Sequence, residues 1–179
     1  MTEVGDLFNS KNFVFKVIGD GEAMFGNDTY NECNGFVSRG LAIGIIKIPS
    51  YVNDYTITVI GKSSFYRCIE IKRIILPNTI KSIEERSISD INIEELIIPA
   101  SVLNIGDRLD YLYRCKSFVF EEGSRLQTIG NYFLTDSNQL EEIVFPHSLK
   151  SIGNFFLTNS IKKGVQPVEN CWISLKFII

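Results

Sequence analysis

Two short stretches of the sequence contain residue types that nucleotide binding and catalysis commonly use. Gly61-Lys62-Ser63 matches the end of a phosphate-binding loop, but that pattern requires a glycine at position 56, where Thr56 stands. The single histidine, His147, follows a proline, and no serine or cysteine stands in a nucleophile motif that it would activate. We therefore expect neither nucleotide binding nor catalysis through His147.

Two acidic pairs, Glu94-Glu95 and Glu141-Glu142, have the chemistry of the acid and base of a carbohydrate-cleaving enzyme. The repeat described below places them two strand spacings apart, about 9.6 Å, with Lys116 between them. A cation in that place lowers the pKa of a carboxyl group, whereas a catalytic acid needs a raised pKa. The sequence predicts no catalytic residues, and we expect a protein that is not an enzyme.

Four cysteines are widely separated: Cys33, Cys68, Cys115 and Cys171. No C-x-x-C motif is present, and one histidine is too few for the usual zinc sites. The expected state is free, mostly buried thiols with structural roles, because unpaired cysteine is among the most buried residue types. We expect no disulfide framework, no metal site and no cofactor.

Composition and charge exclude several kinds of partner. The 179 residues carry a net charge of -3 without a run of like charges, which gives no footprint for nucleic acid. The first residues include Glu3 and Asp6 and lack the apolar run of a secretory signal. The apolar end from Trp172 to Ile179 is too short to span a bilayer. We expect no membrane insertion, and localisation stays open.

A repeated pattern sets the position of all these residues. TIGNYFLT at Thr128 returns as SIGNFFLT at Ser151, 23 positions later. A second motif, L-x-x-I-x-I-P, combines β-branched residues with a final proline that cannot continue a ladder, which predicts a strand. Its copies begin at Ile43, Ile71, Ile93, Cys115, Leu140 and, in degenerate form, Ile161. Copies at a fixed period are typical of stacked-repeat proteins.

One such unit cannot bury its own core, so neighbouring units must stack. The sequence predicts a mainly β fold with short helical turns, a solenoid of stacked parallel strands with about 23 residues per repeat. The glycine of each Ile-Gly pair is expected to turn the chain sharply, and Phe65, Phe133 and Phe156 to fill the interior. We assign an N-terminal cap and first strands to 1–42, repeats to 43–167, and a capping strand or truncated repeat to 168–179.

The stretches FYRCIEIKRIILPNTIKSI and LEEIVFPHSLKSIGNFFL resemble the BspA-like leucine-rich repeat family. The variant FEEGSRLQTIG is similar to a spelling that the family uses where proline is replaced, and FVFKVIGDGEAMF resembles its N-terminal cap. The resemblance implies a leucine-rich repeat solenoid. It also implies a surface protein of the bacterial or protozoan kind that acts in adhesion to host matrix or other cells, without known catalysis.

Positions two, three and five of each strand are expected to face solvent, because side chains alternate along a strand. Positions two and three carry charges whose sign alternates from rung to rung: Lys72, Arg73, Glu94, Glu95, Lys116, Glu141, Glu142, Lys162 and Lys163. Such charges either pair into a ladder that fixes the register or form a recognition strip. Position five carries a β-branched file: Ile75, Ile97, Val119, Val144 and Val165.

This apolar file is the main candidate for a partner-binding surface, since exposed apolar strips mark interaction sites. Strand propensity or a covering loop would also explain it. We predict a non-catalytic module that binds a host-cell or matrix protein through this face at a cell surface. The alternative is an intracellular scaffold, which the missing signal and unpaired thiols favour. If the C-terminal end is the cut edge of a longer array, we expect self-association there.

Overall fold

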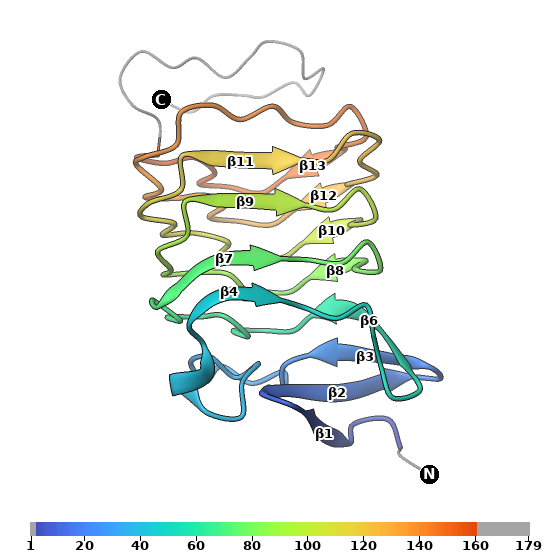
Figure 1. The fold of residues 1–179 in the computed structure, drawn as a ribbon. Coiled ribbons are helices and arrows are strands. Elements are labelled where there is room, and N and C mark those ends of the chain that lie inside the picture. Colours follow the sequence, from blue (N-terminus) through green and yellow to red (C-terminus); the bar gives the residue numbers. More distant parts are fainter. Residues whose placement is uncertain (1–2, 161–179) are drawn as a thin grey trace.

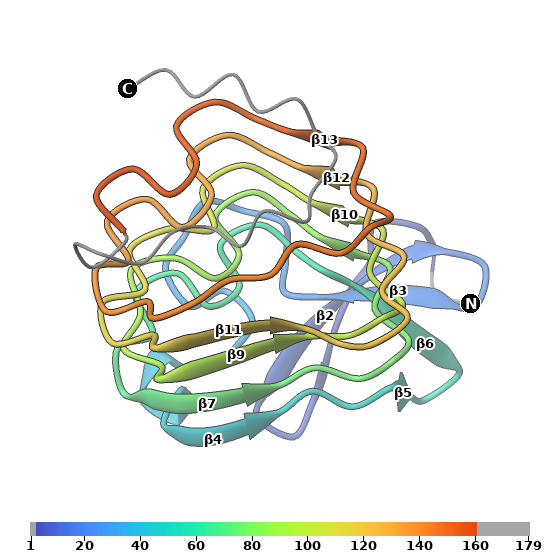
Figure 2. The ribbon, with the colours of Figure 1, turned by 90° about the horizontal axis from the view of Figure 1, so that it is seen from above.

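The computed structural model describes residues 3–160, which form an elongated coil whose successive turns stack on one another (Figure 1). One wall consists of β4 (Gly44–Lys47), β7 (Ile71–Ile75), β9 (Glu95–Ile98) and β11 (Ser117–Phe120). The other wall consists of β6 (Tyr55–Ile60), β8 (Ser82–Ile83), β10 (Asn104–Ile105), β12 (Thr128–Ile129) and β13 (Ser151–Ile152). Viewed along the coil, the two walls enclose the interior (Figure 2). The predicted mainly β fold with stacked parallel strands is confirmed.

The N-terminal part closes one end of the coil. It contains β1 (Leu7–Ser10), β2 (Phe13–Gly19), β3 (Glu22–Phe25) and a 3-10 helix η1 (Arg39–Leu41). A short strand, β5 (Tyr51–Val52), follows β4 and pairs antiparallel with β6. Strands β1, β2 and β3 pair antiparallel, and β3 then pairs parallel with β6. The second wall therefore continues into the N-terminal strands as one sheet, which has nine strands among the described residues.

The first wall is less continuous than the repeat predicts. Its strands pair in parallel as β4 with β7 and as β9 with β11, in two separate sheets. Strands β7 and β9 lie next to each other (Figures 1 and 2) without belonging to one hydrogen-bonded sheet. After β11, a parallel bridge between Ser117 and Glu142 adds one further rung.

The core is built from the repeated apolar positions of both walls. Leu96 from the first wall and Ile105 from the second are buried, as are their counterparts in neighbouring coils. Phe65 and Phe133 are completely buried between the walls, as predicted. Ile43 is an exception: it was expected in the core but is 62% exposed, because β4 has a register shift between Gly44 and Ile45 and Ala42 is buried instead.

The glycine of the Ile-Gly pair has a different role from the one predicted. A Cβ atom on Gly130 would lie 2.6 Å from the backbone nitrogen of Asp107 in the preceding coil, so glycine is required for close stacking. The sharp turn lies two residues further on, at residues other than glycine. Arg86, Arg108 and Tyr132 occupy it with φ values of 54°, 60° and 57°.

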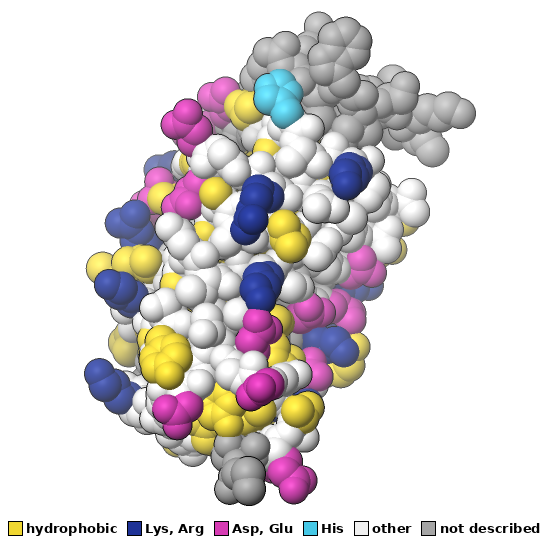
Figure 3. All heavy atoms as spheres, turned by 90° about the vertical axis from the view of Figure 1, so that its right-hand side faces the viewer, with side chains coloured by type: hydrophobic (Ala, Val, Ile, Leu, Met, Phe, Trp, Pro, Cys, Tyr) yellow, Lys and Arg dark blue, Asp and Glu magenta, His cyan; other side chains and the backbone are white. Residues whose placement is uncertain are grey.

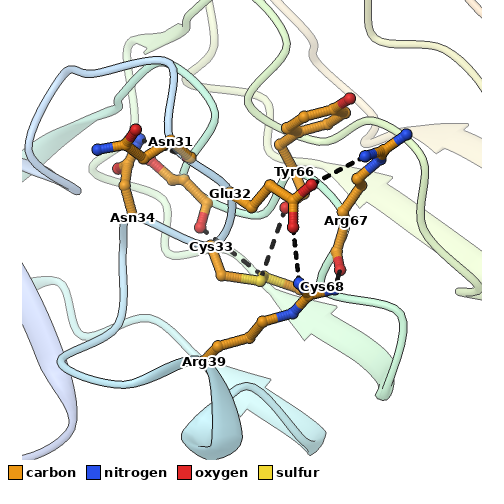
Figure 4. The surroundings of a disulfide bond; sticks show 9 residues. Asn31, Glu32, Cys33, Asn34, Arg39, Tyr66, Arg67 and Cys68 are labelled. Carbon is orange, nitrogen blue, oxygen red and sulfur yellow. Dashed lines mark hydrogen bonds and ion pairs between the residues drawn. A yellow bond between two sulfur atoms is a disulfide. The ribbon is translucent and has the colours of Figure 1, made fainter.

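The expectation of free thiols is wrong for two of the four cysteines. Cys33 and Cys68 form a disulfide with a Cα–Cα distance of 5.6 Å (Figure 4). The spacing of 35 residues gave no sign of this pair, because the fold alone brings the N-terminal segment against the first coil. Cys115 is a buried free thiol, as expected, and Cys171 lies outside the described residues.

Two buried serine side chains satisfy backbone N–H groups inside the coil. Ser137 Oγ accepts a hydrogen bond from the Leu112 N–H, and Ser160 Oγ accepts one from the Ser137 N–H, both at 3.1 Å. Asp90 does not act in this way. Its carboxylate instead accepts a hydrogen bond from Arg67 at the turn surface.

Candidate functional site

The candidate site is the open sheet face, which we define as the outward side of β4, β7, β9, β11 and the rung at residues 140–146. Alternation along each strand creates it: Leu96 and Phe118 point into the core, whereas the residues that follow them point outward. Ile97 and Val119 are register partners on β9 and β11, so they are neighbours on this face.

The predicted apolar file is largely accessible. Ile75 is 38% exposed, Val119 40% and Val144 53%, whereas Ile97 is half-buried. Val165 lies outside the described residues. Ile45, 67% exposed, adds an apolar side chain that the sequence interpretation left out of the file. It pairs with Arg73 in register, so it lies beside the file, while Lys47 stands opposite Ile75.

The charged positions form one ion pair rather than a complete ladder. Arg73 Nη2 lies 3.2 Å from Glu95 Oε2, which links β7 to β9. At the second and third strand positions, five charged side chains have no ion pair within residues 3–160: Lys72, Glu94, Lys116, Glu141 and Glu142. All five are exposed, so most of the charge on this face is available to a partner.

Two hollows interrupt the open sheet face. The larger has a volume of about 350 Å³ and lies over β11 and the next rung, between Lys116, Val119, Glu142 and Val144. The smaller, of about 90 Å³, lies between β7 and β9 and is lined by the Arg73–Glu95 ion pair together with Ile75 and Ile97. The surface around the apolar file therefore has two recesses. Recesses accommodate protruding side chains of a partner better than a flat sheet does.

Charge is distributed without a dominant sign on the side of the molecule that Figure 3 shows. Figure 3 shows acidic, basic and apolar side chains interspersed over the right-hand side of the molecule. Such mixing produces little long-range field, so steering of a polyanion to this side is weak.

Behind the open sheet face, burial raises the pKa of the Cys115 thiol to about 12, which keeps this cysteine inert at neutral pH.

The residues that carry possible chemistry lie apart from one another or are engaged structurally. Glu95 is bound to Arg73, and Lys62 lies 3.9 Å from Asp28 in a long ion pair. Within residues 3–160, no three histidine, cysteine or acidic side chains gather into a possible metal site. None of the helices in this part of the chain is long and apolar enough to cross a membrane.

The family model for the BspA type leucine rich repeat region matches residues 39–163 in six copies. The pneumococcal vaccine antigen PcpA has a similar structure, with a TM-score of 0.64 and 21% identity over 90% of this chain. The leucine-rich repeat protein TpLRR of T. pallidum gives a TM-score of 0.66 and 18% identity; the match covers 87% of this chain and 68% of TpLRR. This chain spans about half of PcpA, 50% of its length. No curated protein matches the sequence.

Proposed function

The chain belongs to the BspA-type leucine-rich repeat family, and on this basis we propose that it is a non-catalytic adhesion module that binds a protein at a cell surface. Leucine-rich repeat solenoids present extended surfaces of this kind for protein–protein interaction. One observation supports the proposal most: the exposed file of Ile75, Val119 and Val144 runs beside charged side chains, most of which have no ion pair among the described residues.

The chemistry of the open sheet face defines the partner. An apolar centre flanked by both signs of charge favours a protein surface with its own apolar protrusion and a mixed charged rim. Aliphatic or aromatic side chains of that partner would enter the hollow beside Val119 and Val144. Lys116, Glu141 and Glu142 around that hollow would select among partners by charge.

The disulfide supports a location outside the cytosol. A bond between Cys33 and Cys68 persists in oxidising surroundings and is rare in reducing compartments. It also removes two of the free thiols that favoured the intracellular scaffold, whereas Cys115 stays a free thiol. PcpA, which has a similar structure, is a vaccine antigen, and this supports a surface location for the present chain.

Protease treatment of intact source cells tests this location. We expect an antibody against the chain to lose its signal while a cytosolic marker survives. A second arm measures retention of the purified chain on immobilised extracellular-matrix proteins and on immobilised albumin. Full protection inside intact cells would overturn the surface role in favour of a scaffold, and equal retention on matrix and albumin would overturn adhesion.

A further inference from the structure

A second recess lies away from the open sheet face, in the connections that lead from the second wall back to the first. It has a volume of about 270 Å³, and we call it the arginine notch. Its lining comes from three successive connections, β6 to β7, β8 to β9 and β10 to β11 (Figure 2). The lining residues are Tyr66, Arg67, Arg86, Ser89, Asp90, Arg108, Asp110, Tyr111 and Tyr113.

Three arginines line this notch, but only one of them is neutralised. Arg67 Nε donates to Asp90 Oδ2 at 2.7 Å. Arg67 Nη1 donates to Glu32 Oε1 at 2.9 Å, as Figure 4 shows. Arg86 and Arg108 have no ion pair or side-chain hydrogen bond within residues 3–160. Two guanidinium groups therefore remain with their donors free.

The two free arginines stand at equivalent places in adjacent coils. Arg86 N–H donates to the carbonyl of Asp107, and Arg108 N–H donates to that of Asn131, the same bond one coil further on. Their backbones are thus one strand spacing apart, about 4.8 Å. In the next two coils the position holds Tyr132 and Phe155. The positive φ recurs throughout the array, and the pair of arginines distinguishes these two coils.

Aromatic rings hold both arginine side chains in place. The Arg108 guanidinium lies 4.7 Å from the centroid of the Tyr132 ring, and that of Arg86 lies 5.2 Å from the Tyr66 ring. Stacking of this kind orders a long side chain while its N–H groups stay available. The notch therefore presents donors that are already oriented, which lowers the entropy lost on binding.

Nearby carboxylates bind neutral donors and form no ion pair with Arg86 or Arg108 among the described residues. Glu85 accepts a hydrogen bond from the Tyr30 hydroxyl at 3.0 Å, and Asp107 accepts one from the Asn131 N–H at 2.8 Å. Asp110 in the notch is 2% exposed and accepts a hydrogen bond from Ser89 Oγ. Burial raises the pKa of Asp110, which the Ser89 hydrogen bond and the two arginines oppose.

We infer that the arginine notch binds an acidic sugar, whose oxyanion lies against Arg86 and Arg108 and whose hydroxyl groups contact the polar lining. Paired guanidinium groups suit a planar or tetrahedral oxyanion because their donors form a fork. A carboxylate on a peptide would bind only the arginine donors and would leave the other polar groups of the notch unused. The notch also supplies the hydroxyl groups of Tyr111 and Tyr113 beside it, with ring centroids 5.9 Å apart, as partners for sugar hydroxyls.

Calorimetry at low salt with four probes tests this inference on the purified chain. A hyaluronan tetrasaccharide carries carboxylates, a heparin tetrasaccharide adds sulfates, maltotetraose is neutral, and tetraglutamate places carboxylates on a peptide. We expect one or both acidic sugars to bind, which identifies the oxyanion, and the neutral sugar and peptide to bind at least tenfold more weakly.

Variants then assign the binding to the notch. Arg86→Gln and Arg108→Gln should each weaken binding about tenfold, as loss of one charged hydrogen bond predicts. Arg108→Lys keeps the stem and the charge but loses the fork, and should weaken binding about threefold without disturbing the fold. Arg125→Gln removes an exposed positive charge outside the notch and should change nothing.

Three results would overturn the inference: no binding of either acidic sugar, equal binding of tetraglutamate, or affinity that all three notch variants leave unchanged. The inference is independent of the proposed function, because no residue of the notch belongs to the open sheet face. Failure of protein adhesion would leave sugar binding intact, and the reverse also holds.

Discussion

The ion pair between Arg73 Nη2 and Glu95 Oε2, at 3.2 Å, joins β7 to β9 at the place where the first wall is not continuous as a sheet. The two strands belong to separate hydrogen-bonded sheets, so this side-chain contact connects them across the gap. Both side chains are largely accessible, 50% and 42%, so water screens the attraction. The pair therefore contributes little to the stability of the coil.

Reversing one member of this pair should have a small effect. We expect Arg73→Glu to lower the free energy of unfolding by less than about 1 kcal/mol, and Arg73→Glu with Glu95→Arg to recover most of that loss. Lys72→Glu is the matched control, because Lys72 has no ion pair among the described residues. Urea denaturation measures all four proteins, and a double variant no more stable than the single one would contradict the assignment.

Gly130→Ala should damage the coil because its new Cβ would meet the Asp107 backbone nitrogen at 2.6 Å. We expect a loss of about 1 to 3 kcal/mol, typical of overpacking against a backbone that cannot yield. Gly40→Ala is the control, since nothing lies within 4 Å of its Cβ position and its φ is not positive. Equal stability of the two alanine variants in urea would show that close stacking does not require the glycine.

Removal of the disulfide should lower the free energy of unfolding, because the unfolded chain gains conformational entropy when the bond is absent. The bond closes a separation of 35 residues, which predicts a loss of about 3 to 4 kcal/mol for the Cys33→Ser, Cys68→Ser double variant. Peptide mapping of the unreduced chain should recover a fragment that links the two cysteines. Recovery of both as free thiols from protein purified under oxidising conditions would contradict the structure.

The buried thiol of Cys115 predicts a dependence of stability on alkaline pH. Its pKa is raised in the folded protein from 9.0 to about 12, so the folded state binds this proton more tightly than the unfolded chain. The resulting stabilisation is complete below pH 9 and is lost between pH 9 and about 12.

The advantage of the natural chain over Cys115→Ala should therefore shrink above pH 9 by about 1.4 kcal/mol per pH unit. Urea denaturation of the two proteins at pH 8 and at pH 10 measures this difference. A gap that stays constant with pH would show that the thiol is not protected by burial.

The sequence predicts the fold well because every coil repeats the same pattern of apolar residues. Apolar residues such as Leu96 and Ile105 recur in phase, and stacking is the one arrangement that buries both walls. Departures arise where two coils meet or where the pattern changes. The shift at Gly44 that exposes Ile43, and the close approach that requires Gly130, depend on the neighbouring coil rather than on one unit.

The two candidate sites differ in how far the sequence predicts them, and the reason is again whether their residues lie inside the strand motif. Val119 and Val144 are predictable from alternation, because a strand residue between two core positions must point outward. Arg86 and Arg108 stand in the connections, outside the strand motif of the repeat. The sequence does hold a signal for them, since two arginines fill one column that later coils fill with Tyr132 and Phe155. The positive φ of each of these residues confirms that they share a column.

Retention on matrix proteins by face-specific variants tests the central claim, that the coil binds proteins through its open sheet face. Val119→Ser with Val144→Ser removes two exposed side chains beside the larger hollow without emptying the core. Val37→Ser, at a residue 49% exposed and outside that face, is the control. We predict that the folded double variant loses at least tenfold in retention while the control keeps it. Equal retention of all three proteins would contradict the account.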